Sequence, residues 1–242
     1  MIAEALRARV GLRRFPALTT VVAAVTFGTA VVQAVVPGTL RDLQRTPAGL
    51  HGDWWRSLTS LFVQDGGVAG TVFNLIGLLA VGAVAEQAME RWRWLAQYFG
   101  VGVASEFVGY AWQPVGGGNS IAVCGLAGGL ALALWRRDPR LPAPAGPVAA
   151  LWSVAMVATI GRYGWIPAAV LGSATINASR LFGARGIDVR HLLAAAIPLA
   201  GIILCAWQNI HGAALLIGVT LALALARGRL DEIRFTAPIQ RC

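Results

Sequence analysis

The sequence is poor in charge, since only 13% of its 242 residues are charged and none of its basic residues is a lysine. Soluble domains carry charge on about a quarter of their residues. Here 57% of the residues are hydrophobic, and apolar stretches recur from near Pro16 to near Ala226. Many of them approach the roughly 20 residues that a helix needs to cross a bilayer. The composition therefore favours a membrane protein and leaves no room for a separate soluble domain.

Cysteine is also scarce. Cys124 and Cys205 lie within apolar stretches, and Cys242 is the last residue. This arrangement matches neither a disulfide framework nor the spacing of a metal site. We expect no metal ion and no organic cofactor.

The formal charge of +9 raises the question of nucleic-acid binding. A nucleic-acid-binding protein gathers its basic residues on one face or along one helix. Here the arginines form short clusters between apolar stretches, a distribution that reflects membrane topology. We expect no nucleic-acid partner.

The apolar stretches predict an all-α fold, a polytopic transmembrane helix bundle. Six spans are expected over residues 18–36, 68–87, 95–112, 120–134, 192–207 and 210–226. The stretch from Gly146 to Phe182 is apolar but interrupted around Arg162, and it predicts two short spans or a hairpin. The total is then about eight spans.

Arginine clusters indicate the orientation, because positively charged loops stay on the cytoplasmic side. With the N-terminus inside, eight spans leave only Arg41, Arg45, Arg56 and Arg162 facing outward. We expect residues 1–16 to be a basic cytoplasmic segment, 17–227 the transmembrane domain and 228–242 a cytoplasmic tail, in a protein of the cell membrane. The same topology starts the helices of Ser120 and His211 at the outer surface, running in one direction.

Ser120 stands where a glycine loop, Gly116–Gly118, turns into an apolar helix. Glycine lets the backbone enter the membrane region where protein surrounds it or a wet cavity adjoins it. The N-terminus of a helix also presents unpaired N–H groups that can bind a developing oxyanion. The alternative is that Ser120 or Asn119 is only an N-cap.

His211 is the only histidine predicted within a span. Ionisable groups inside membranes are expensive and usually functional, although a histidine can also serve helix packing. Small residues four apart, namely Gly125, Gly129 and Ala133 on one helix and Ala214 and Gly218 on the other, predict a close approach of the two helices. Glu106, within the third span, is expected to make a structural hydrogen bond, with lining the cavity as the alternative. Glu86 and Arg56 are expected to be architectural.

Several motifs together resemble the rhomboid family from Trp55 to Gly218. They are Trp55-Arg56, Phe73-Asn74-Leu75 with Gly82 and Glu86, Gly118-Asn119-Ser120, Arg137-Asp138-Pro139, and His211 with Gly218. The resemblance implies a six-helix core, here with extra helices, and an intramembrane serine protease that acts on membrane proteins within the lipid bilayer. Ser120 would be the nucleophile, His211 its general base and Asn74 an oxyanion donor. The alternative for Asn74 is an interhelical hydrogen bond.

Three positions depart from the family pattern. Ile121 stands in place of the glycine that follows the serine, and Gly70 in place of a histidine one turn before the asparagine. Cys124 replaces a larger residue that packs on the histidine. These departures leave open a second function, an inactive pseudoprotease that binds membrane clients. A transporter or channel is disfavoured, because no inverted repeat is evident and few charges lie within the spans.

Overall fold

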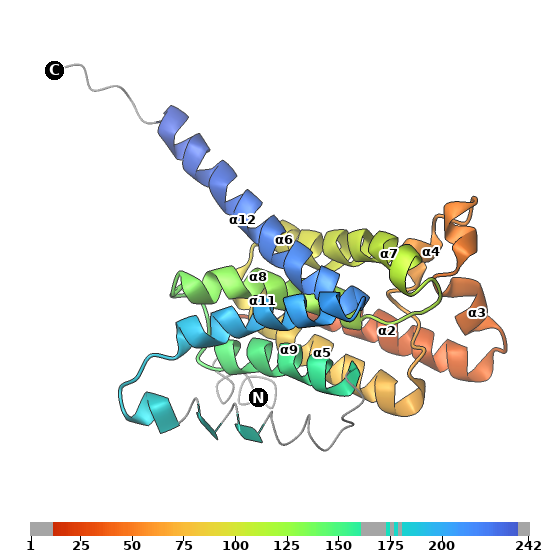
Figure 1. The fold of residues 1–242 in the computed structure, drawn as a ribbon, viewed down its shortest axis with the longest axis horizontal. Helices are drawn as coiled ribbons and strands as arrows, with labels where there is room; N and C mark the ends of the chain where they lie inside the picture. Colours follow the sequence, from red (N-terminus) through yellow and green to blue (C-terminus); the bar gives the residue numbers. More distant parts are fainter. Residues whose placement is uncertain (1–11, 161–172, 175–176, 179–180, 237–242) are drawn as a thin grey trace.

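The computed structural model describes residues 12–160, 173–174, 177–178 and 181–236. This part of the chain is helical and contains no strand, only one isolated bridge between Arg45 and Gly116. The long helices are α2 (Ala17–Val35), α5 (Gly67–Ala88), α8 (Ser120–Trp135), α9 (Ala145–Ile160), α11 (Arg190–Ala206) and α12 (Ile210–Thr236). These helices pack together as a bundle (Figure 1). This arrangement confirms the predicted all-α transmembrane fold.

One further span is continuous but irregular. Helix α6 (Arg91–Leu95) runs through a π-helical turn, η2 (Ala96–Gly100), into α7 (Val101–Trp112). Such π-turns widen a helix locally and are frequent at functional sites. The side-chain amide of Gln97, within this turn, donates to the backbone carbonyl of Gly218 in α12 at 3.1 Å.

Among the residues that the structure describes, three helices are long and apolar enough to cross a membrane: Ala17–Val35, Gly67–Ala88 and the first part of α12, Ile210–Arg227. The apolar helices α8, α9 and α11 are shorter. Of the two short spans predicted between Gly146 and Phe182, the first corresponds to α9, and the second lies largely outside the described residues. Arg162 lies outside them as well.

The first two spans are tied together at one end of the bundle by Glu86. Its carboxylate accepts hydrogen bonds from the backbone N–H groups of Leu18 and Thr19 and from the Thr19 hydroxyl. These are the unpaired N–H groups of the first turn of α2, where a negative charge is favourable. In return, the Arg14 guanidinium donates to the carbonyls of Glu86 and Met89 at the end of α5. The expected architectural role of Glu86 agrees with these contacts.

Helix α8 lies at the centre of the bundle, with almost every residue buried, and packs most extensively against α12. Their contact depends on glycine: a Cβ atom at Gly218 would lie 2.5 Å from the backbone carbonyl oxygen of Gly125. Gly128 likewise meets the backbone of α12 at Leu215. The expected close approach of these helices is therefore present.

The predicted small-residue face was wrong at one position. Gly129 does not face α12, because a Cβ atom there would meet Met89 and Gln97. Among the glycines of α8, Gly125 and Gly128, three apart, meet the backbone of α12. Contact that shifts from one row of residues to the next is expected where two helices cross at an angle.

Short helices cap one end of the bundle, which we call the serine end because α8 begins there. They are α3 (Thr39–Leu43), η1 (Pro47–Leu50) and α4 (Arg56–Thr59), in the stretch that is too polar to cross lipid. Helices α5, α8 and α12 begin at the serine end, whereas α11 begins at the other end, where His191 contacts the Trp135 carbonyl. The last turns of α9 reach the serine end, beside Phe73 near the start of α5.

Candidate active site

Ser120 is the first residue of α8, and the loop before it is held on three sides. Gly116 exchanges two backbone hydrogen bonds with Arg45, and Gly117 exchanges two with Asp65, one of them to the carboxylate. The Gly118 N–H donates to the Ser60 carbonyl at 2.8 Å. A Cβ atom at Gly117 would lie 2.8 Å from a methyl group of Val63, so this close fit requires glycine. Hydrogen bonds at three successive glycines and this close contact therefore fix the conformation of the loop that positions the serine.

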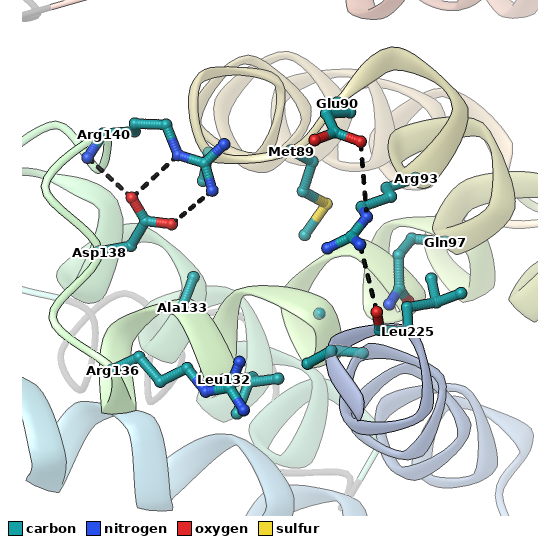
Figure 2. A pocket seen from close by; sticks show the side chains of 14 residues that line it. Met89, Glu90, Arg93, Gln97, Leu132, Ala133, Arg136, Asp138, Arg140 and Leu225 are labelled. Atoms are coloured by element: carbon teal, nitrogen blue, oxygen red, sulfur yellow. Dashed lines mark hydrogen bonds and ion pairs between the residues drawn. The ribbon is translucent and has the colours of Figure 1, made fainter. Parts of the chain in front are cut away.

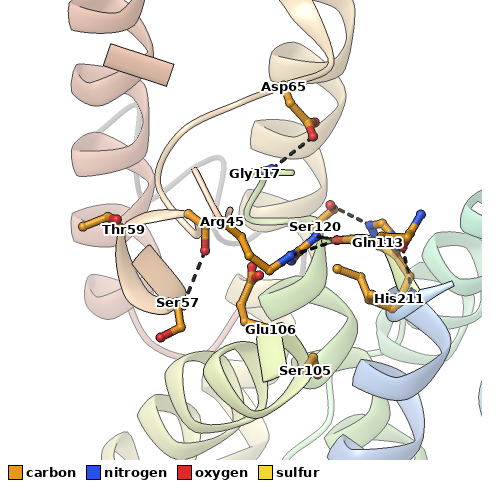
Figure 3. Close-up of polar contacts among 12 residues, drawn as sticks. Arg45, Ser57, Thr59, Asp65, Ser105, Glu106, Gln113, Gly117, Ser120 and His211 are labelled. Atoms are coloured by element: carbon orange, nitrogen blue, oxygen red, sulfur yellow. Dashed lines mark hydrogen bonds and ion pairs between the residues drawn. The ribbon is translucent and has the colours of Figure 1, made fainter. Parts of the chain in front are cut away.

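The Ser120 hydroxyl oxygen lies 2.9 Å from Nε2 of His211, the second residue of α12 (Figure 3). This is hydrogen-bond distance for a nucleophile and its base. Asn119, and not Ser120, occupies the N-cap position of α8, and its side chain makes no capping bond. The contact of Ser120 is thus with His211 and not with its own helix.

Asn209 determines which nitrogen of His211 faces Ser120. Its Oδ1 accepts from the backbone N–H of His211 at 3.0 Å and lies 2.7 Å from Nδ1 of the same residue. Because the backbone N–H can only donate, the side-chain atom that faces it must be the oxygen, and Nδ1 must therefore carry the proton. Nε2 is then the unprotonated nitrogen, ready to accept the hydroxyl proton of Ser120.

Asn74, the predicted oxyanion donor, lies beside Ser120 across Gly118. A Cβ atom at Gly118 would lie 3.4 Å from Nδ2 of Asn74 and 3.5 Å from the Ser120 hydroxyl oxygen. Nδ2 of Asn74 donates to Oε1 of Gln64 at 2.7 Å, and Nε2 of Gln64 donates to Oδ1 of Asn119 at 3.2 Å. This chain of amides orients the nitrogen of Asn74 and leaves its second proton available to another acceptor.

A buried ion pair supports the loop and the start of α12 together. Arg45 and Glu106, with side chains 2% and 0% exposed, form a salt bridge (Figure 3). Arg45 also donates twice to the carbonyl of Gln113, at 3.0 and 2.6 Å. The side-chain oxygen of Gln113 accepts from the backbone N–H of Ile210, the residue before His211. Glu106 thus makes a structural contact, as expected, and the Arg45 side chain is buried with it.

The three departures from the family pattern differ in their surroundings. Gly70 faces open space, since a Cβ atom there would meet nothing within 4 Å. Ile121 and Cys124 are buried in the main hydrophobic core, at 4% and 0% exposure. Of the three positions, only Gly70 leaves open space in the site. It lies four residues before Asn74 and therefore on the same face of α5.

Sequence reasoning missed four residues that hold the site: Asn209, Gln64, Arg45 and Gln113. Only Asn209 carried a signal, because asparagine is a preferred N-cap and stands two residues before the histidine, where the predicted turn meets the last span. The other three lie in loops or at a helix end, and their partners are distant in the sequence. No group of three or more potential metal ligands occurs among the residues that the structure describes.

The fold and this geometry define a class: a polytopic helical membrane protein with a serine and a histidine in hydrogen-bond contact at the starts of two neighbouring helices. The Rhomboid domain family matches residues 51–186, which is more than half of the chain, so the chain belongs to the rhomboid family. The matched range includes Asn74 and Ser120 and ends before His211. Searches of curated proteins and of solved structures gave no match.

Proposed function

We propose that this protein is an intramembrane serine protease of the rhomboid type that hydrolyses peptide bonds in or near the transmembrane segments of other membrane proteins. The observation that carries the proposal is the 2.9 Å contact between the Ser120 hydroxyl and Nε2 of His211. Membership of the rhomboid family supports it.

In the proposed reaction, Nε2 of His211 takes the hydroxyl proton while the Ser120 oxygen attacks the carbonyl carbon of the substrate peptide bond. The carbonyl oxygen becomes an oxyanion, for which the N–H groups of the first turn of α8 and Nδ2 of Asn74 are the donors. As the intermediate collapses, the carbon–nitrogen bond breaks and His211 returns its proton to the leaving amine. In the second half of the reaction, His211 accepts a proton from water as the water oxygen attacks the acyl carbon. The bond to the Ser120 oxygen then breaks, His211 returns the proton to that oxygen, and the new carboxyl end of the substrate leaves.

We further propose the orientation that the arginine clusters predict. Residues 1–16 and the tail 228–242 would be cytoplasmic, and 17–227 would form the membrane domain in the cell membrane. The serine end of the bundle, with Ser120 and His211, would then face the outer surface. Reporter fusions before Ala17 and within Thr39–Leu43 test this arrangement, and a cytoplasmic signal from the second fusion would overturn it.

A fluorophosphonate probe tests the catalytic proposal, because it reacts with activated serines. We expect purified wild-type protein to be labelled and Ser120→Ala to remain unlabelled. His211→Ala should label at least about 10³-fold more slowly, since it loses the base. Equal labelling of wild type and Ser120→Ala, or none of either, would contradict the proposal. Cleavage of a membrane-protein substrate by wild type, and not by His211→Ala, would then establish turnover.

A client-binding pseudoprotease is the second candidate, and the open space at Gly70 favours it, because a donor that the family pattern supplies there is missing. Loss of one oxyanion donor lowers a rate by about 10²- to 10³-fold. Specific capture of a membrane protein by Ser120→Ala and wild type alike, with no labelling of either, would be its signature.

A further inference from the structure

A cavity of about 280 Å³ lies at the end of the bundle opposite to Ser120. Figure 2 shows the side chains that line it. It is bounded by the end of α5, by α6, by the last turns of α8 and by α12. Arg136, one of its lining residues, directly follows α8, whose 16 residues span about 24 Å from Ser120. The cavity is therefore separate from the candidate active site.

Its walls and its rim differ in chemistry. The walls are apolar and consist mainly of Ala88, Met89, Leu132, Ala133, Ala222 and Leu225. The rim carries three guanidinium groups, from Arg93, Arg136 and Arg140, and two carboxylates, from Glu90 and Asp138. Figure 2 shows the three arginines around the cavity, each from a different helix or loop. An apolar interior under a charged rim suits an amphipathic ligand.

The two carboxylates already have arginine partners. Asp138 pairs with Arg140 at 2.7 Å, and the Arg140 hydrogen bond lowers the pKa of that carboxyl group. Glu90 lies 3.7 Å from Arg93, which also donates to the Leu225 carbonyl. The Arg136 guanidinium has no polar partner in the part of the chain that the structure describes. The rim therefore keeps one net positive charge, at Arg136.

We propose that this cavity binds an anionic phospholipid, with the phosphate diester at Arg136 and the neighbouring arginines, and part of an acyl chain along the apolar wall. Basic pockets between transmembrane helices are suited to anionic headgroups, particularly on the side where positive residues gather. Arginine suits a phosphate because its planar fork can donate two hydrogen bonds to two oxygens. The volume lies near the small end of ligand pockets, enough for a headgroup and the beginning of a chain.

The test is lipid binding to the whole protein in neutral detergent, measured by native mass spectrometry together with thermal unfolding. We expect phosphatidylglycerol to bind and to raise the melting temperature, and phosphatidylcholine to do neither. Arg136→Gln should weaken phosphatidylglycerol binding about fivefold or more, since one arginine near a membrane surface contributes on that order. Ala133→Leu, which fills the cavity without changing charge, should weaken it as well.

Arg137→Gln is the matched control. Arg137 is the next residue, it does not line the cavity, and its charge is already paired with Asp188 at 3.2 Å. Its replacement should change phosphatidylglycerol binding less than twofold. An equal loss in Arg136→Gln and Arg137→Gln would mean general surface attraction and would overturn the site.

Two further outcomes would also refute the proposal. Equal binding of phosphatidylglycerol and phosphatidylcholine would show that the negative charge of the headgroup does not contribute to binding. Equally tight binding of glycerol phosphate, which has no acyl chain, would show a site for small anions and not for a lipid. Ser120→Ala should bind phosphatidylglycerol as wild type does, so the result does not depend on whether the protein is a protease.

Discussion

Asn209 and His211 are joined twice, since one side-chain oxygen of Asn209 contacts both the backbone N–H and Nδ1 of His211, at 3.0 and 2.7 Å. The first bond caps α12, and the second directs the imidazole ring toward Ser120. A single asparagine thus sets where the helix starts and which histidine nitrogen is free. In the proposed mechanism, Asn209 is a positioning residue that acts through His211.

Replacing Asn209 should separate these two effects. We expect Asn209→Ala to reduce the rate of fluorophosphonate labelling about 10- to 100-fold, because the ring loses its orientation. Asn209→Asp keeps an acceptor at the same place and should retain most of the rate. Labelling is to be measured per folded molecule, with unfolding followed separately. If both variants label at the wild-type rate, Asn209 only caps the helix.

Gly70 offers a gain-of-function test. It lies four residues before Asn74 on α5, and a Cβ atom there would meet nothing within 4 Å, so a side chain can start at this position without a backbone clash. If the missing donor limits the proposed protease, Gly70→His should raise the labelling rate or the cleavage rate, by up to about 10²-fold. Gly70→Ala is the control, because it adds helix propensity without adding a donor. An equal effect of both variants would exclude a role for the imidazole.

Any side chain at Gly218 should destabilise the contact between α8 and α12. A Cβ atom there would lie 2.5 Å from the Gly125 carbonyl oxygen, so Gly218→Ala must push α12 away from α8. We expect a loss of about 1–3 kcal/mol in stability, as for other overpacked sites, and slower labelling as His211 moves from Ser120. Gly28→Ala is the control, since Gly28 lies within α2 and faces open space. Equal melting temperatures for the two variants would contradict the close packing.

The Arg45 to Glu106 pair predicts a large effect on stability. Glu106→Gln leaves the Arg45 guanidinium buried without its counter-charge, and breaking a buried pair in this way costs about 3–5 kcal/mol. The free energy of unfolding in detergent micelles measures this. Glu90→Gln, which removes a partly exposed carboxylate 3.7 Å from Arg93, should change it by less than about 1 kcal/mol. A similar small change in Glu106→Gln would mean that the pair does not hold the loop.

The sequence alone determined the helical spans and the family. Apolar stretches of bilayer length, interrupted by arginine, glycine and proline, are local features, and the observed helices begin and end within a few residues of most of the predicted ones. The motifs around Asn74, Ser120 and His211 are local as well, so the candidate residues could be named before their positions were known. The second short span after α9 remains a prediction.

The tertiary structure alone decided how the site is held. Arg45 meets Glu106, Gln113 and Gly116 across more than 60 residues of sequence, and Gln64 links Asn74 with Asn119. Such contacts depend on the angles at which helices cross and on the paths of the loops. Neither the periodicity nor the composition of the sequence contains this information. The same reason explains the incorrect face at Gly129. Spacing along a helix places residues on a side, but the crossing angle of the partner helix selects which of them make contact.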